Sequence, residues 1–164
     1  MAYRTTRNIE ASIITYLNSI IDTDWSNINV VKGFKQVYNL VMTETKKNAI
    51  ICVRSGVTTH DRVEIGSSST KRQIHILIDL FCTSDGQRLD LKDWVIEKIK
   101  GGCTYYEFTI ENGGISRQTD SGNITILDID DVPIDFDVDK DKLDVHDRYR
   151  HLITLNCSIG QVEA

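Results

Sequence analysis

The most chemically suggestive part of this sequence is a run of aspartates near its C-terminal end. Nine aspartates and only two lysines lie between residues 128 and 147, a stretch that we name the acidic loop. It carries a formal charge of −7, whereas the whole chain of 164 residues carries −5. Carboxylates at this density can bind calcium, hold a catalytic metal ion, or remain solvated and repel one another. The spacing of the aspartates helps to decide between these three interpretations.

An EF-hand calcium site is the first to consider, because Asp137, Asp139 and Asp141 occupy alternate positions. An EF-hand needs glycine at the sixth position of its loop and glutamate at the twelfth, where this sequence has Lys142 and Arg148. A looser calcium site, in which several oxygens converge, stays open. The pattern favours a solvated loop, and we expect it to bind no structural metal and the protein to need no cofactor.

Catalytic interpretations of the remaining residues are weak. A metal-dependent hydrolase built on the aspartates is an alternative, but such enzymes hold their acids rigidly. None of the four histidines pairs with a cysteine at zinc-ligand spacing, and no two of them stand at the i, i+4 spacing of a metal-binding pair on a helix. The four cysteines form no CxxC pair and stand in apolar or β-rich contexts typical of reduced core thiols. No G-x-S-x-G motif and no phosphate-binding loop is present. We therefore expect a protein that is not an enzyme.

Length and composition set the class of protein. A chain of 164 residues with 40% hydrophobic and 26% charged residues is typical of one soluble globular domain, here residues 1–164. No apolar run approaches the roughly 20 residues that span a bilayer, and the first ten residues lack the apolar core of a signal peptide. The mild negative charge gives no support for general nucleic-acid binding. We expect no membrane partner and no export.

The elements that must position these residues begin with a helix. Isoleucines and a leucine recur at helical spacing from Ile9 to Ile21, and we expect Thr5 or Thr6 to cap this helix and the sequence DTD to end it. A short strand is expected around the sequence INVV. Residues 34–47 fit a strand as well as a helix, and both interpretations stay open.

Strong β signals follow. The sequence AIICVRSG predicts a buried strand, and KRQIHILIDLFCT alternates between two faces. One face of the second strand consists of Ile74, Ile76, Ile78, Leu80 and Cys82. The residues between the two strands are polar and rich in glycine and serine, which predicts a long hairpin arm over residues 57–72.

A second helix is predicted from the sequence DLKDWVIEKIK. We expect Asp85-Gly86 to form a turn, Asp90 to be the N-cap, and Leu89 to pack on Trp94 as a hydrophobic staple. Gly101-Gly102 should end the helix. The buried stripe should contain Leu91, Trp94, Val95 and Ile99, with Trp94 largely buried.

The C-terminal third is β-rich. Strands are expected at CTYYEFTI, NITILDI and RYRHLITLNCSI, with the acidic loop opened by Pro133 before the last of them. The order of helix, strands, helix and strands predicts an α+β fold: a mostly antiparallel mixed sheet with helices packed on one face and a long β-hairpin arm.

The order of these elements, with the phrases IDLFCTSDGQRLDLKDW and RYRHLITL, resembles the tail-terminator proteins of tailed bacteriophages. The resemblance covers roughly residues 6–159. It implies a structural virion protein of the neck, made in the host cytoplasm, that forms a homohexameric ring, caps the tail tube and ends its polymerisation. The implied partners are the tail tube protein and a head-connector or stopper protein, with genome DNA passing through the ring without specific binding. The family has no catalytic residues.

Ring contacts join unlike surfaces, so oppositely charged segments are candidate interfaces. The candidates are Arg62, Glu64, Lys71 and Arg72 of the hairpin arm, Asp137, Asp139 and Asp141 of the acidic loop, and Arg148 and Arg150, which we expect to form ion pairs. Two other structural hypotheses stay open: another head–tail connector or head-completion subunit, and a monomeric binding module that presents the arm and the loop to a basic partner.

Overall fold

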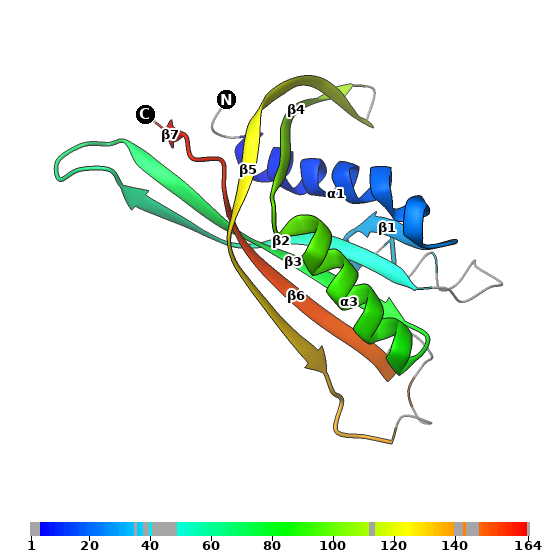
Figure 1. Ribbon diagram of the computed structural model, residues 1–164. Helices are drawn as coiled ribbons and strands as arrows, with labels where there is room; N and C mark the ends of the chain where they lie inside the picture. Colours follow the sequence, from blue (N-terminus) through cyan, green and yellow to red (C-terminus); the bar gives the residue numbers. More distant parts are fainter. Residues whose placement is uncertain are drawn as a thin grey trace.

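The computed structural model describes residues 4–34, 36, 37, 40, 49–111, 114–139, 143 and 148–163. Its elements are α1 (Thr5–Asp24), β1 (Asn29–Lys32), β2 (Ile50–Arg62), β3 (Thr70–Cys82), α3 (Asp85–Ile99), β4 (Cys103–Glu111), β5 (Gly114–Ile134), β6 (Tyr149–Ser158) and β7 (Val162–Glu163). Both long helices lie against one side of a mixed sheet (Figure 1). The predicted α+β fold is confirmed.

The sheet has the order β1-β2-β3-β6-β5-β4, and β7 pairs with β3. Only the pairing of β1 with β2 is parallel; the other described pairings are antiparallel. The long strand β5 changes partner along its length, because Ile124 pairs with Cys103 of β4 and the next residue, Thr125, pairs with Ser158 of β6. One strand therefore joins the β4 ribbon to the main sheet.

The core lies between the helices and the centre of the sheet. The predicted apolar face of β3, from Ile74 to Cys82, is fully buried at all five positions. It packs with one stripe of α1 and one stripe of α3. The stripe residues are Ile9, Ile13, Leu17 and Ile21 of α1 and Leu91, Val95 and Ile99 of α3. Helical and strand periodicity therefore predicted the core correctly.

The start of α1 differs from the prediction. The helix begins at Thr5, and the residue at its N-cap is Arg4, which makes no capping hydrogen bond through its side chain. Thr5 is buried in the first turn, while the Thr6 hydroxyl accepts a hydrogen bond of 3.0 Å from Arg72. The expected threonine cap is therefore wrong, and the Thr6 hydroxyl instead connects α1 to the base of the hairpin arm.

The start of α3 was also predicted wrongly. Ser84 is the N-cap, and its hydroxyl accepts a hydrogen bond from the Gln87 backbone N–H at 3.2 Å. The Gln87 carboxamide oxygen in turn accepts the backbone N–H of Thr83 at 2.8 Å. These bonds let the helix begin at Asp85 rather than just after Asp90, so the sequence Asp85-Gly86 is helical and Asp90 lies inside the helix.

Trp94 is only partly buried, which corrects the expectation that it would be a central core residue. Its indole N–H donates a hydrogen bond of 2.9 Å to the Asp24 carboxylate at the end of α1. A tryptophan needs a partner for its N–H, and this requirement holds the ring at the margin of the core. Leu89, the expected staple partner, is 43% exposed.

The acidic loop is shorter than predicted. Residues 128–134 belong to β5 and pair with β6, from Asp128 opposite Asn156 to Ile134 opposite Arg150. Pro133 fits this strand because no described strand pairs with β5 on its other side here, and proline is tolerated at a sheet edge. Residues 135–139 follow as exposed chain. Asp141 and most of residues 34–47 lie outside the described residues.

The edge strand β4 is covered by polar side chains of α1. The Asn8 carboxamide accepts the backbone N–H of Phe108 at 3.3 Å, and the Ser12 hydroxyl accepts the backbone N–H of Tyr106 at 2.9 Å. The Arg7 guanidinium donates to the Phe108 carbonyl at 2.7 Å. Backbone groups that an edge strand would otherwise expose are therefore satisfied within the subunit.

Gly102 should be essential to the turn after α3. Its φ is +78°, and a Cβ built there would lie 2.2 Å from the backbone oxygen of Ile124. We expect Gly102→Ala to destabilise the protein by at least about 2 kcal/mol, since left-handed backbone strain and a backbone clash add together. Urea unfolding would measure the change. Gly101→Ala is the control, because a Cβ there meets nothing within 4 Å and should be nearly neutral.

Candidate interaction surfaces

The predicted interface residues fall into two groups at opposite ends of the sheet. Arg62, Glu64 and Lys71 are exposed on the hairpin arm. Arg72 lies at the base of the arm and is engaged within the subunit, because its guanidinium contacts Glu163 of β7 at 3.0 Å. The second group, around Asp137, lies beyond the other end of β3 (Figure 1).

The hairpin arm is a continuation of β2 and β3. The two strands remain paired as far as Arg62 opposite Thr70, after a register shift between Ser55 and Thr58. The arm extends past the helices, at the left of Figure 1. Its tip exposes apolar side chains as well as polar ones: Val63 is 48% exposed and Ile65 is fully exposed at 103%. The composition of the arm predicted a polar segment and did not predict the exposed apolar side chains at its tip.

The acidic end of the sheet combines charge with apolar groups. Asp135, Asp137 and Asp139 are exposed and alternate with Phe136 and Val138, which are 36% and 54% exposed. The Val138 backbone N–H donates to the Phe136 carbonyl and closes a tight turn. Alternating charged and apolar side chains make this segment a surface that can contact a partner.

Of the two arginines after the acidic loop, Arg148 donates a hydrogen bond of 3.0 Å from Nε to the Leu143 carbonyl. Arg150 forms the expected ion pair, with its Nη2 3.4 Å from an oxygen of Asp79. Arg150 also stacks over the Phe81 ring at 4.5 Å, on the sheet face opposite the helices. Its guanidinium therefore belongs to a structural cluster inside the subunit.

Asp79 is the centre of that cluster and is fully buried. Its other oxygen accepts a hydrogen bond of 3.0 Å from Arg54 Nε on β2, so one carboxylate lies between two guanidinium groups. The sequence offered one signal, an aspartate inside the apolar run ILIDLF, but Arg54 is 25 residues away and strand pairing had to bring it near. Each oxygen of the Asp79 carboxylate therefore has a guanidinium partner, which makes the cluster a structural salt bridge.

A second polar cluster is centred on the buried side chain of His151, which is 3% exposed. Its Nε2 is 2.7 Å from Asp131, and its Nδ1 is 2.8 Å from Nη1 of Arg88. Arginine can only donate, so Nδ1 accepts and the proton of the neutral ring lies on Nε2, facing Asp131. Both ring nitrogens are occupied, which leaves no free nitrogen to act as a general base.

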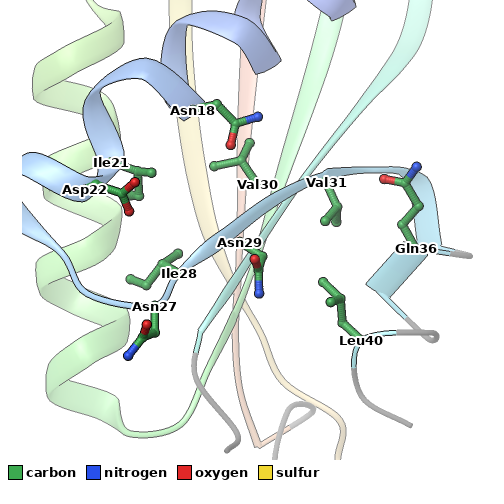
Figure 2. A pocket seen from close by; sticks show the side chains of 10 residues that line it. All are labelled: Asn18, Ile21, Asp22, Asn27, Ile28, Asn29, Val30, Val31, Gln36 and Leu40. Atoms are coloured by element: carbon green, nitrogen blue, oxygen red, sulfur yellow. The ribbon is translucent and has the colours of Figure 1, made fainter. Parts of the chain in front are cut away.

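A groove of about 560 Å³ lies between the end of α1 and the edge strand β1 (Figure 2). We name it the edge groove. The exposed carboxamides and one exposed carboxylate of its lining are its rim, and the buried or half-buried aliphatic side chains are its floor. The rim residues are Asn18, Asp22, Asn27, Asn29 and Gln36, and the floor residues are Ile21, Ile28, Val30, Val31 and Leu40. Such a groove can bind a polypeptide, because amides both donate and accept hydrogen bonds.

The cysteines are free thiols, as their sequence context predicted. Burial raises the pKa of Cys52 to about 11 and the pKa of Cys82, Cys103 and Cys157 to about 12. Thiolate is the nucleophilic form, so these side chains are poor nucleophiles at neutral pH. No group of three side chains that could hold a metal ion occurs in the part of the chain that the structure describes.

Comparisons with known proteins give no family. The sequence matches no protein-family model, and it matches no curated protein. Among the described residues, no helix is both long enough and apolar enough to cross a membrane.

The Asp79 cluster predicts a stability effect. Asp79→Asn keeps the side-chain shape but leaves the charges of Arg54 and Arg150 without their shared carboxylate, and we expect a loss of about 3 kcal/mol in the free energy of unfolding. Chemical denaturation would measure it. Asp130→Asn is a matched control, since Asp130 is exposed on β5 and should change stability by less than about 0.5 kcal/mol. Equal effects of the two substitutions would contradict a structural role for Asp79.

The raised thiol pKa values predict a loss of stability at alkaline pH. In the unfolded chain a thiol ionises near its ordinary pKa of 9.0, whereas in the folded protein burial raises the pKa of Cys157 to about 12. Protonated thiols favour the folded state fully below pH 9, and this contribution falls as the pH rises above 9, by at most about 1.4 kcal/mol per thiol per pH unit. Unfolding in urea at about pH 8 and about pH 10.5, on either side of the ordinary thiol pKa, would test this. Cys157→Ala should lose less stability over that interval than the parent.

Proposed function

We propose that this protein is a structural subunit of a bacteriophage neck, which assembles into a homohexameric ring, caps the tail tube and ends its polymerisation. The observation that carries the proposal is the hairpin arm. Its strands extend beyond the helix-covered core, and its tip exposes Val63 and Ile65. Exposed apolar side chains on a projecting hairpin are typical of a segment that is stabilised by another subunit.

The polar clusters favour a structural role over catalysis. Asp79 is neutralised by Arg54 and Arg150, and both ring nitrogens of His151 have partners. The thiols are buried, or half-buried in the case of Cys103, and have raised pKa values. Catalytic groups generally keep one reactive atom accessible, and these groups contribute to stability instead.

A ring explains why the candidate interfaces differ from one another. In a ring each subunit uses one surface toward the next subunit and a different surface toward the previous one. The hairpin arm and the acidic end of the sheet lie at opposite ends of β3, so they can serve different neighbours. In this proposal the ring faces the tail tube protein on one side and a head-connector or stopper protein on the other, with DNA passing through it without specific contacts.

The proposal predicts the behaviour of a shortened arm. We expect deletion of Ser67–Ser69 to leave thermal stability nearly unchanged, because this turn lies outside the core, and to impair ring formation and tube capping. Native mass spectrometry would give the number of subunits, and electron microscopy would give the length of tail tubes grown with the cognate tube protein. Leu89→Ser, an exposed apolar position on α3, is the control and should preserve capping.

Tubes of normal capped length with the shortened arm would contradict the role of the arm. A parent protein that binds neither itself nor tail tubes at any concentration would contradict the proposed function. Binding to heads without any effect on tubes would instead indicate a connector subunit.

A further inference from the structure

The arm tip, residues 62–67, exposes apolar side chains that are not packed into the core of their own subunit. Ile65 is fully exposed and Val63 is half exposed, next to Arg62. The Arg62 guanidinium donates to the Ser67 carbonyl and makes no ion pair with a residue that the structure describes. The edge groove is a hollow of about 560 Å³ whose floor is aliphatic. We propose that the arm tip of one copy binds in the edge groove of the next copy; this inference rests on the proposed ring.

The two surfaces cannot meet within one molecule. The base of the arm is fixed near the start of α1 by the hydrogen bond from Arg72 to Thr6, and the edge groove is built on the last turns of α1, around Asn18 and Asp22. A helix of 20 residues is about 30 Å long, and the arm projects further away from the groove (Figure 1). A contact between arm tip and edge groove must therefore join two copies, and because it joins unlike surfaces it leads to a ring when the rotation closes.

Charge complementarity supports this occupant. Among the residues that line the edge groove, Asp22 is the one charged side chain, and it makes no ion pair with described residues. Arg62 brings a guanidinium to the same contact, and arginine pairs well with a carboxylate. The rim carboxamides of Asn27 and Asn29 can donate to Glu64 and accept from backbone N–H groups of the arm tip.

The shape of the groove supports it as well. The groove lies along β1, which ends the order of strands in the sheet, so its wall includes an edge strand as well as side chains. Figure 2 shows the side chains of Val30 and Val31 on β1 between those of Asn18 and Gln36. An isoleucine between aliphatic floor residues, surrounded by a polar rim, has the arrangement of a central interface anchor.

Cross-linking provides the test. A full-length chain with Ile65→Cys and Asn29→Cys should form disulfides between copies on mild oxidation, in assembled rings or capped tubes, and give a ladder of covalent oligomers. The native cysteines should contribute little, since burial raises their pKa. The matched control pair, Ile65→Cys with Val138→Cys, places the second thiol at the acidic end of the sheet and should give no ladder.

Charge reversal provides an independent readout. Arg62→Asp and Asp22→Arg should each raise the protein concentration needed for assembly by about tenfold, and the double variant should recover most of that loss. Rings of normal mass that cross-link through Val138→Cys, or that show no recovery in the double variant, would overturn the groove contact and leave the proposed function intact. A protein that never assembles, even with cognate tail tubes, would overturn both.

Discussion

The strict alternation of side chains along β3 is the constraint on which the rest of the structure depends. At every second position from Ile74 to Cys82 an aliphatic side chain or a thiol is fully buried toward the helices, while Asp79 and Phe81 face the other side. A slip of one residue in its pairing with β2 or β6 would move Asp79 into the aliphatic core and expose the isoleucines. The ion pairs of Asp79 with Arg54 and Arg150 form only in the observed register. The charged face and the apolar face of β3 therefore both favour the same register of β3 with β2 and β6.

The positions where the helices end decide which parts of the sheet are exposed. Both helices cover the segment of β3 from Ile74 to Cys82, and the strand continues beyond them toward Thr70. There the side chains have no helix to pack on, which is why the arm is exposed on both faces. At the other end, the last turns of α1 and the edge strand β1 diverge enough to leave the edge groove. The projecting arm is thus a result of helices that end before the strands do, and the edge groove lies at the opposite end of α1.

Local periodicity predicted the core and the class of fold, because helices and strands bury their apolar side chains at fixed spacings. It failed where a bond between distant residues decides the outcome. Trp94 was expected in the core, but its N–H is held by Asp24, which is 70 residues away. The N-cap of α3 was placed at Asp90 because a good cap was visible there, while Ser84 with Gln87 offered a better one. The aspartates from 128 to 131 indicated a loop, yet pairing with β6 makes them part of a strand. The partner of Asp79 and the edge groove depend on tertiary packing and had no local signal.

The polar contacts of α1 with β4 keep this edge strand from pairing with other chains. Asn8 and Ser12 occupy backbone groups of a strand that would otherwise be open to pairing with any extended chain. The first helix is therefore a shield as well as a layer of the core. Removing it, by proteolysis or by a shortened clone, would uncover β4 together with the aliphatic face of the sheet. We expect the remaining fragment to aggregate through pairing of its exposed strands. At high protein concentration the chain depends on this helix to stay dispersed.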